Sequence, residues 1–527
     1  MRNFSSILRW HAERTPEKIA IRFEGKEIPY EELDLTTSSF ASSIKAHGGR
    51  PNEIVAILLY NTPEFYYAAI GANKAGLAFL PLNYRLAREE IKYILSNSQA
   101  KFLVTQSQFK DQVDQIRNEL PDLSTCLIVD GPSDEGWINF NSFVSRSGER
   151  ISHVDYEPNP EDMHRLMYTS GTTANPKGVV VTYSNMWWKT FAHSLELESN
   201  KNDVALVAGP LYHVGAFDLA AAHVLYAGGS LVILRRFEPK DCLEAIEKYK
   251  VTVTWLAPSM LNMILHQEDL SSYNLTSMRL IIDGGEKMPE PLINKLLSAF
   301  PNTWYADAYG LTETVSGDTF VPKEYMKKKL GSVGRPTPFV ELRVVDENGN
   351  ELPAVTDGEI VIRGPKVFNG YWKDEAATRS AIREGGWFHT GDIGHIDEDG
   401  FLYITDRKKD MIKSGGENVS SLEIERVLYQ HPDVKEVAVV GMKDDTWGEV
   451  PVAFVVPKQA ADLSDKVLLD FCTNKLARFK MPKKFFIQEE PLPRNPSGKV
   501  LKRVLRDRVI LHPRETKVRT DSTASYD

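Results

Sequence analysis

Residues 168–182 read YTSGTTANPKGVVVT and concentrate hydroxyl groups, glycine and one lysine between two apolar runs. A polar segment in this position is most often a solvated turn between two strands. Gly171 would let the backbone aim its N–H groups at a ligand, and Lys177 supplies the cation that phosphate oxygens bind. The hydroxyl groups stand at Thr169, Ser170, Thr172 and Thr173. This combination favours a phosphate-binding loop over a plain turn.

The spacing within this segment rules out the Walker A phosphate loop. That motif has glycine directly before its lysine and serine or threonine after it. Here Pro176 precedes Lys177, and Gly178 follows it. A P-loop kinase or GTPase is therefore disfavoured.

Four further motifs follow in order along the chain: YADAYGLTET (305–314), FHTGD (388–392), DRKKDMIKSGGENV (406–419) and PRNPSGKVLK (493–502). Together with residues 168–182 they resemble the motifs of the adenylate-forming superfamily. That superfamily includes acyl-CoA synthetases, the adenylation domains of peptide synthetases and beetle luciferases. The resemblance extends from residue 13 to Lys502 and so covers nearly the whole chain.

The resemblance implies a reaction in two halves that uses ATP, Mg²⁺ and coenzyme A. A carboxylate first attacks the α-phosphorus of ATP, giving an acyl-adenylate and pyrophosphate. A thiol then attacks the acyl carbon and expels AMP. Since the first half brings an anion to a polyanion, neutralisation of charge must dominate the first transition state.

The resemblance also assigns residues to the reacting end of ATP. Thr312 and Glu313 lie beside the α-phosphate, with Glu313 as the Mg²⁺ ligand, although a glutamate outside this context is usually a solvated carboxylate. Lys499 is the catalytic lysine that bridges the attacking carboxylate and the α-phosphate. The β- and γ-phosphates are assigned to Thr169, Ser170, Gly171, Thr172, Thr173 and Lys177.

Adenine and ribose are assigned to three other motifs. Tyr309 would stack on adenine, unless it is an ordinary core aromatic residue, and Asp307 would accept a hydrogen bond from the adenine amino group. Asp392 would accept hydrogen bonds from both ribose hydroxyls, with Arg407 beside it. The remaining adenine candidates are Gly284, Gly285, Glu286 and Ala308, although a Gly-Gly pair alone usually marks only a turn.

The second half-reaction implies a movement of the C-terminal part of the chain. Lys499 lies far along the sequence from the nucleotide residues, so a C-terminal domain must close over the site. In the superfamily this domain then rotates about a hinge, which Lys409 matches here. Rotation would bring Gly415 and Gly416 to the acyl-adenylate, where their lack of side chains lets a pantetheine arm pass. It would also remove Lys499 from the site.

The acid pocket is assigned by resemblance to small and apolar positions. An uncharged aliphatic or aromatic acid suits them better than an amino acid, whose ammonium group wants a carboxylate partner. Asp218 or Asp283 would weaken this argument if either pointed into the pocket. His213 would gate entry of the acid or would be a buried structural histidine. The candidates are His213, Gly215, Ala216, Ser259, Ala308 and Gly317.

Short β-branched runs alternate with helical patterns and predict an α/β fold with mostly parallel sheets. Examples are NEIVAILLY followed by TPEFYYAAIGANKAG, and GSLVILRRF followed by EPKDCLEAIEKYK. From about residue 334, short strands with Asn-Gly and Asp-Gly turns predict a β-rich portion. The expected domains are an ATP- and acid-binding domain (1–405), a hinge (406–410), a mobile α+β domain (411–512) and a polar tail (513–527).

Composition excludes several classes of protein. The 527 residues carry a net charge of -9, which argues against a basic nucleic-acid binder. No apolar run is long enough for a membrane span, and the N-terminus lacks a signal-peptide core. Cys126, Cys242 and Cys472 are too far apart in sequence for a zinc motif, and a reducing, cytoplasmic location is expected. The oligomeric state is not readable from the sequence.

Four functions are compatible with these motifs. The first is an acyl-CoA ligase for a medium-chain, branched or aryl acid. The second is an adenylating enzyme that loads a carrier-protein phosphopantetheine arm, although no carrier domain is fused here. The third is a nucleotide-binding regulator without catalysis, and the fourth is a luciferase-like oxygenase. One departure from the superfamily is Ala174, where glycine is usual, and it is expected to stiffen the loop.

Overall fold

The computed structural model folds into two compact units. One comprises Met1–Leu342 and Val361–His389, and the other comprises Arg343–Ile360 and Thr390–Asp527. Each unit has apolar clusters of its own. The structure describes residues 4–134, 136–145, 156–169, 176–285, 288–408, 410–414, 417–444, 447–458, 463–473, 475–494 and 500–511.

Among the described residues, eight strands form one sheet of the larger unit, in the order β19-β9-β8-β4-β3-β5-β6-β7. Its central strands pair in parallel, whereas β9 is antiparallel to both β8 and β19. The strands are β3 (Ile54–Leu58), β4 (Ala78–Pro81), β5 (Phe102–Thr105), β6 (Thr125–Ile128), β7 (Trp137–Asn139), β8 (Met163–Thr169), β9 (Lys177–Thr182) and β19 (Gly370–Tyr371).

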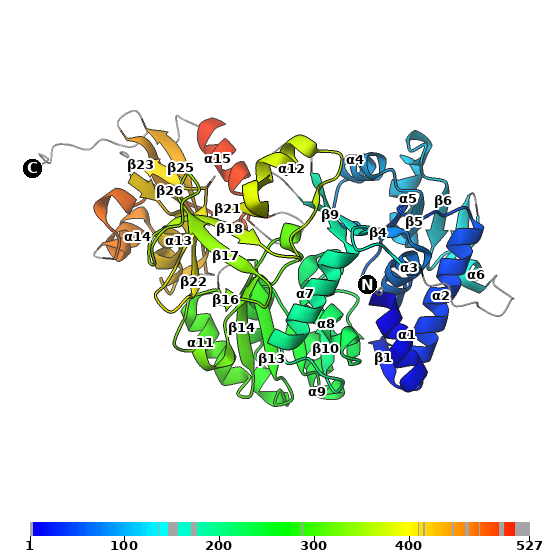
Figure 1. Cartoon of the computed structure of the whole chain (residues 1–527). Coiled ribbons are helices and arrows are strands. Elements are labelled where there is room, and N and C mark those ends of the chain that lie inside the picture. The colour runs from blue at the N-terminus through cyan, green and yellow to red at the C-terminus, as the bar shows by residue number, and fades with distance from the viewer. Residues whose placement is uncertain are drawn as a thin grey trace, which may run out of the picture. The chain divides into compact units, whose positions relative to one another are not determined.

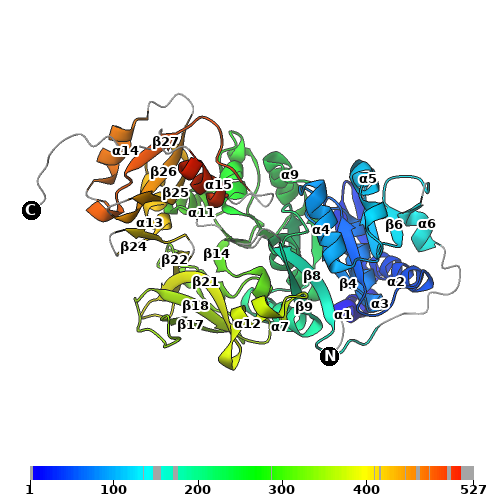
Figure 2. The same ribbon diagram turned by 90° about the horizontal axis from the view of Figure 1, so that it is seen from above.

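Helices cover both faces of this sheet (Figure 2). The helices in this part of the chain are α1 (Phe4–Arg14), α2 (Tyr30–Ala46), α3 (Pro63–Ala75), α4 (Arg88–Ser98), α5 (Ser107–Asp114), η1 (Arg117–Glu119) and α6 (Phe140–Ser145). Ile54, Ala56 and Leu58 of β3 belong to the apolar cluster of α4 and α5, while Val55 and Ile57 belong to that of α2 and α3. Because successive strand residues point to opposite faces, a strand covered on both faces is a continuous apolar run.

The other sheet of the larger unit has nine strands within the described ranges, ordered β16-β15-β14-β13-β12-β10-β11-β1-β2. The six strands from β14 to β1 are parallel, and the outer strands are antiparallel. The strands are β1 (Ile19–Phe23), β2 (Lys26–Pro29), β10 (Val204–Val207), β11 (Ser230–Ile233), β12 (Val253–Trp255), β13 (Leu280–Gly284), β14 (Trp304–Tyr309), β15 (Thr319–Phe320) and β16 (Arg335–Pro336).

The two faces of this sheet carry different helices (Figure 1). Three of them, α9, α10 and α11, share an apolar cluster with one face, while η2 and α8 belong to the cluster on the other. The element η2 is a π-helix. Such helices are rare, and those that occur are often found at functional sites. The elements are α7 (Tyr183–Glu196), η2 (Gly215–Ala222), α8 (His223–Tyr226), α9 (Pro239–Tyr249), α10 (Pro258–Leu265), η3 (Leu270–Ser272), α11 (Glu290–Ala299), η4 (Thr312–Thr314) and η5 (Lys323–Tyr325).

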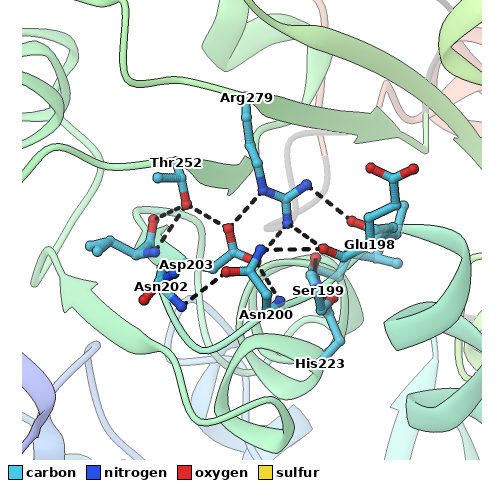
Figure 3. A network of polar contacts seen from close by, with 11 residues as sticks. Glu198, Ser199, Asn200, Asn202, Asp203, His223, Thr252 and Arg279 are labelled. Carbon is cyan, nitrogen blue, oxygen red and sulfur yellow. Dashed lines mark hydrogen bonds and ion pairs between the residues drawn. The ribbon is translucent and has the colours of Figure 1, made fainter.

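A polar network holds the connection between α7 and β10 (Figure 3). The Arg279 guanidinium donates to both carboxylate oxygens of Asp203, at 2.7 and 2.6 Å. The Ser199 hydroxyl lies 2.6 Å from Nδ1 of His223, whose Nε2 donates to the Leu219 carbonyl at 2.8 Å. The network therefore ties the end of α7 to the π-helix.

The chain passes from one unit to the other within three strands: β17 (Glu341–Val345), β18 (Gly358–Arg363) and β21 (Trp387–Ile396). These strands belong to a sheet of the order β17-β18-β21-β20, in which β22 also pairs with β21. The other elements in this part are α12 (Glu375–Ala381), β20 (Ile382–Arg383), η6 (Glu384–Gly386) and β22 (Leu402–Arg407).

The C-terminal part of the smaller unit is a sheet with helices. Its order is β24-β23-β26-β25, and β27 pairs in parallel with β26. The elements are β23 (Ile412–Ser414), β24 (Glu417–Val419), α13 (Ser421–Tyr429), β25 (Val434–Asp444), β26 (Gly448–Pro457), α14 (Asp465–Cys472), η7 (Arg478–Lys480), β27 (Lys484–Ile487) and α15 (Lys502–Leu511).

The predicted fold class is confirmed: large, mostly parallel α/β layers are followed by a separate C-terminal domain. The predicted boundaries at residues 405 and 410 stay a prediction. The two compact units divide the chain at other positions, after residues 342, 360 and 389. The predicted tail, 513–527, lies outside the described residues. In the part of the chain that the structure describes, no helix combines the length and apolar character that crossing a bilayer requires.

Candidate active site

Thr312 and Glu313 lie on η4, a single turn of 3₁₀ helix shortly after β14. The backbone carbonyl of Glu313 accepts a hydrogen bond from the Phe368 N–H at 2.7 Å. Its Oε1 accepts another from the Tyr371 hydroxyl at 3.0 Å. Both contacts come from residues 368–371, so this short segment fixes the direction of the carboxylate.

Tyr371 also contacts the lysine of the candidate phosphate loop. Lys177 is the first residue of β9, and its Nζ lies 5.1 Å from the centre of the Tyr371 ring. This contact follows from strand pairing, since Tyr371 of β19 is the partner of Val179 in β9. Burial and the Glu313 carboxylate raise the pKa of Tyr371, so its hydroxyl stays a hydrogen-bond donor. One ring thus brings together a carboxylate and a cation that the sequence places 136 residues apart (313 minus 177).

The candidate phosphate loop connects two antiparallel strands. Thr169 ends β8 and is the direct partner of Lys177 in β9, so these two residues face each other at the mouth of the connection. The predicted strand–loop–strand arrangement is therefore present. Ser170, Gly171, Thr172, Thr173 and Ala174 lie outside the described residues.

The adenine candidates come from the ends of two neighbouring strands. Asp283 of β13 pairs with Asp307 of β14, and Gly284 pairs with Ala308. Gly284 has φ +152°, and a Cβ atom there would lie 2.6 Å from the Ala308 carbonyl oxygen. Only glycine permits this close approach. Gly285 has φ +88°, Tyr309 is buried beside Ala308, and Glu286 lies outside the described residues.

Alternation along β14 separates these candidates by face. Ala308 belongs to the same apolar cluster as Ala216 and Trp255, next to η2. Tyr305 belongs to the cluster on the opposite face, and its hydroxyl donates to Asp283 at 2.9 Å. Burial and the neighbouring Asp307 charge raise the pKa of Asp283 well above its usual range. Asp283 therefore lies on the face away from η2.

The ribose candidates are direct partners on neighbouring strands of the smaller unit. Asp392 of β21 pairs with Arg407 of β22, and the Arg407 Nε lies 3.1 Å from the Asp392 carboxylate. The Asp392 side chain is 6% exposed, whereas that of Arg407 is 40% exposed. A carboxylate held by one arginine retains acceptor capacity for a diol, so this donor and acceptor set fits a ribose.

The predicted hinge is anchored at one end to α13. Buried Asp406 accepts hydrogen bonds from the backbone N–H and the hydroxyl of Ser421, at 2.6 and 2.7 Å. Ser421 is the first residue of α13, where a carboxylate is favoured by the helix dipole. Lys409 of the hinge, Gly415 and Gly416 of the CoA channel and the catalytic candidate Lys499 lie outside the described residues.

Several candidates for the acid pocket gather around Trp255, which sequence reasoning missed. The His213 ring stacks on the Trp255 indole with centroids 5.5 Å apart, and His213 Nδ1 accepts a hydrogen bond from the Gly215 N–H at 3.1 Å. A Cβ atom at Gly215 would lie 2.4 Å from the indole. Trp255 is the last residue of β12, and this position shortly before Pro258 was the only signal in the sequence.

The other pocket candidates are less closely grouped. Ala216 follows Gly215 on η2 and is buried, and Ser259 is half-buried near the start of α10. Gly317 is buried against the His193 ring, and its carbonyl accepts from His193 Nε2 and Lys366 Nζ. Its contacts among the described residues are thus to the protein core.

Asp218, on the same π-helix as Ala216, is engaged by two cations. The Arg165 guanidinium donates to its carboxylate at 2.6 Å, and the Lys189 ammonium lies 3.7 Å from the other carboxylate oxygen. All three side chains are fully buried. Asp218 is therefore paired, and Asp283 lies on the face away from η2. Neither residue offers an unpaired carboxylate to an ammonium group beside η2.

The residues present fit a magnesium–nucleotide complex. Glu313 offers a directed carboxylate, Lys177 offers a cation at the same ring, and Mg²⁺ is usually held by one or two carboxylates together with phosphate oxygens. Asp392 and Arg407 offer a site for a diol.

Comparison with known proteins agrees with this geometry. Residues 8–372 match the family described as AMP-binding enzyme, and residues 423–499 match the AMP-binding enzyme C-terminal domain. The indoleacetate–CoA ligase of Aromatoleum aromaticum is 36% identical over 493 residues, which cover 93% of this chain and 95% of that protein.

Two solved structures share the fold over almost their full length. The anthranilate CoA ligase AuaEII in complex with anthranoyl-AMP has a TM-score of 0.90 and 26% identity, and the match covers 97% of this chain and 98% of that one. The o-succinylbenzoate coenzyme A synthetase of Bacillus subtilis in complex with ATP and a magnesium ion has a TM-score of 0.83 and 31% identity, covering 97% and 99%. The chain therefore belongs to the AMP-binding enzyme family of the adenylate-forming superfamily, and it is an AMP-forming acid–thiol ligase.

Proposed function

We propose that this enzyme is an aryl-CoA ligase. It activates an aryl carboxylic acid without a positive charge as the acyl-adenylate, with release of pyrophosphate, and then forms the CoA thioester with release of AMP. The observation that carries the choice of acid is the stacked pair of His213 and Trp255 beside the small residues of η2. Flat aromatic surfaces favour an aromatic ligand through offset stacking or edge contacts.

The buried carboxylates near this pair support an acid without a positive charge. Asp218 is neutralised by Arg165 and Lys189, and Asp283 faces the opposite side of its sheet. An amino acid substrate would need a carboxylate for its ammonium group, since an unpaired buried charge costs several kcal/mol or more. The relatives named for indoleacetate, anthranilate and o-succinylbenzoate also support an aryl acid.

In the first half-reaction, the chain's own residues neutralise and direct charge. Lys177 binds phosphate oxygens, while Tyr371 holds Glu313 toward the metal position beside the α-phosphate. Mg²⁺, when bound, neutralises phosphate oxygens and so lowers the repulsion between ATP and the attacking carboxylate. Lys499 bridges that carboxylate and the α-phosphate as a point charge.

In the second half-reaction, free coenzyme A is the proposed acceptor. The relative from Aromatoleum aromaticum is named a CoA ligase, which supports this choice. Gly415 and Gly416 would let the pantetheine arm reach the acyl carbon. Loading of a carrier protein is the alternative, and it differs from the proposal only in the acceptor.

A cytoplasmic location is part of the proposal. Cys126, Cys242 and Cys472 are free thiols and are buried. Such thiols are stable in a reducing compartment.

A panel of acids tests the proposal. Pyrophosphate release is measured with ATP, Mg²⁺ and either aryl acids (indoleacetate, 2-succinylbenzoate, anthranilate, benzoate), medium-chain or branched acids, or amino acids. An aryl acid is expected to give the highest kcat/KM, by about 10-fold or more over the best aliphatic acid. AMP release with that acid is expected to require free CoA. Preference for an aliphatic acid, or for holo carrier protein, would contradict the corresponding half of the proposal.

A further inference from the structure

The turn that follows Glu313 is held in a strained backbone conformation. Val315, Ser316 and Gly317 have φ values of 56°, 62° and 61°, so three consecutive residues are left-handed. This region is unfavourable for side chains with a Cβ atom, and for a β-branched valine most of all. Such a conformation persists only where surrounding contacts enforce it.

Lys366 provides these contacts. Its Nζ donates to the carbonyl oxygens of Ser316 and Gly317, at 2.8 and 2.7 Å. It also forms an ion pair with the Asp318 Oδ1 at 2.9 Å. Two of the three N–H donors of the ammonium group thus bind the turn, and the Asp318 carboxylate balances its charge. Lys366 is 2% exposed and Asp318 is fully buried.

Asp318 extends the contact to both ends of η4. The Thr314 hydroxyl donates to the Asp318 Oδ2, and Thr314 Oγ1 accepts from the Leu311 N–H at 3.1 Å. Leu311 precedes η4, and Thr314 is its last residue. The buried Lys366–Asp318 pair therefore holds the turn that follows Glu313. Through Thr314 it also holds Leu311, which precedes η4.

Lys366 is itself fixed by its neighbours. The Asn185 amide, on α7, donates to the carbonyls of Pro365 and Val367, at 3.0 and 2.8 Å. Two residues beyond Lys366, the Phe368 N–H donates to the Glu313 carbonyl. One continuous segment thus holds Glu313 directly, through Phe368 and Tyr371, and holds its turn through Lys366.

We propose that Lys366 is a positioning residue for adenylation, because its buried ammonium clamps the left-handed turn and so fixes Thr312 and Glu313 relative to the reacting phosphate. The inference rests on the proposed function for the role of Glu313 at the metal. A buried ion pair that served folding alone would affect both half-reactions only through the amount of folded enzyme. A clamp for Glu313 affects the step that uses the metal.

The test is the double variant Lys366→Met/Asp318→Asn, which removes both charges together and so leaves no unpaired buried ion. Its matched control is Lys74→Met/Asp34→Asn. Lys74 is another fully buried lysine, with Nζ contacts to Asp34 Oδ1, the Asp34 carbonyl and Ser38 Oγ at 2.5, 3.0 and 2.9 Å. It joins α2 to α3, and neither helix carries a candidate site residue.

Two rates are measured for each purified variant: pyrophosphate release, as a function of Mg²⁺ concentration, and thioester formation from a supplied acyl-adenylate. In Lys366→Met/Asp318→Asn, pyrophosphate release should fall by about 10-fold or more, and the Mg²⁺ concentration for half-maximal rate should rise by about 10-fold, as for other groups that orient metal ligands. Thioester formation should stay within about twofold of wild type. The control should keep the wild-type Mg²⁺ requirement.

Two further variants separate the possible failures. Glu313→Gln should cripple pyrophosphate release; if it does not, the proposed role of Glu313 is wrong. If Glu313→Gln is crippled while the double variant matches its control, the clamp is wrong. Thr314→Val removes only the hydroxyl that contacts Asp318 and keeps the side-chain shape. It should raise the Mg²⁺ requirement by a smaller factor, and an unchanged requirement would overturn the clamp even if the double variant did not fold.

Discussion

At the scale of single residues, the candidate site depends on atoms that approach each other more closely than usual. The backbone of Gly215 lies against the Trp255 indole, with room for hydrogen but not for a methyl group. The same glycine donates its N–H to His213, which stacks on that indole. The position of the ring therefore depends on the absence of one side chain.

Gly215→Ala should disturb the acid pocket selectively. The new methyl group would have to displace the Trp255 ring, which a Cβ would meet at 2.4 Å. The KM for the aryl acid should rise, or kcat/KM fall, by about 10-fold, the effect of a hydrophobic pocket changed by one methylene. The KM for ATP should stay the same. Steady-state kinetics with each substrate varied in turn checks this outcome.

Gly71→Ala is the control for a buried clash. A Cβ atom there would lie 2.6 Å from the Phe40 ring, between α3 and α2. This variant should lose stability without a selective change in the KM for the acid. If Gly215→Ala changed both KM values equally, the pocket assignment of Trp255 would be wrong.

Some candidate residues could be identified from the sequence, whereas others depend on tertiary neighbours. Glu313, Lys177, Asp392 and Arg407 stand in motifs, and the structure brings them together within their own units as pairs or around Tyr371. Tyr371 and Trp255 were missed because neither lies in one of the motifs that the sequence singles out. Their importance comes from strand pairing and from packing against glycine, which no local pattern encodes.

At the scale of elements, the π-helix η2 was not predicted. Its sequence, GAFDLAAA, is apolar apart from Asp218 and gives no sign of a wider turn. By contrast, both α3 and the residue that ends it were predicted, because glycine commonly closes a helix. In the structure Gly76 follows α3 and has φ +87°. Strands such as β3 were predicted because they are covered on both faces and are therefore uniformly apolar.

The buried histidine at the end of η2 should make stability depend on pH. Burial, with a contribution from the charge of Lys189, lowers the pKa of His223 to about 3. Between about pH 3 and 6.5 the unfolded chain therefore binds a proton at His223 that the folded chain does not. The free energy of unfolding should fall as the pH falls through this range, by about 1.4 kcal/mol per pH unit for this group.

His223→Gln should reduce this dependence. Its melting temperature is expected to be lower than that of wild type at pH 7.5, because the contacts of His223 with the Ser199 hydroxyl and the Leu219 carbonyl are changed. Its further loss of stability between pH 6.5 and 5.0 should be smaller than in wild type. Urea unfolding at several pH values measures both. His266, which is exposed, supplies the control variant His266→Gln; equal slopes for all three proteins would contradict the assignment.

At the scale of the whole molecule, the proposed mechanism uses different sets of residues for its two half-reactions. The adenylation set includes Glu313 and Lys177 in the larger unit, while Asp392, Arg407 and Lys499 belong to the smaller unit. The hinge, 406–410, and the rotation about it stay predictions. Asp406 is bonded to Ser421 of α13, so the first hinge residue is attached to the C-terminal domain.

Lys499→Ala should separate the half-reactions. Adenylate formation should fall by about 100-fold or more, since removal of a charge that stabilises the transition state typically costs this much. Thioester formation from a supplied acyl-adenylate should be nearly unchanged. Lys435→Ala, at an exposed position of β25, controls for loss of surface charge. An equal loss in both half-reactions would contradict the rotation.

The three crossings of the chain between the units, within β17, β18 and β21, have a consequence for dissecting the protein. Two domains joined by a single linker can be separated by one cut, whereas these cannot. A truncation after residue 405 would retain 343–360 and 390–405, which belong to the smaller unit. A chain that ends at the proposed hinge would thus keep strand-forming segments of the smaller unit without the rest of that unit. Such a fragment should be prone to aggregation, and it would not report the behaviour of a free domain.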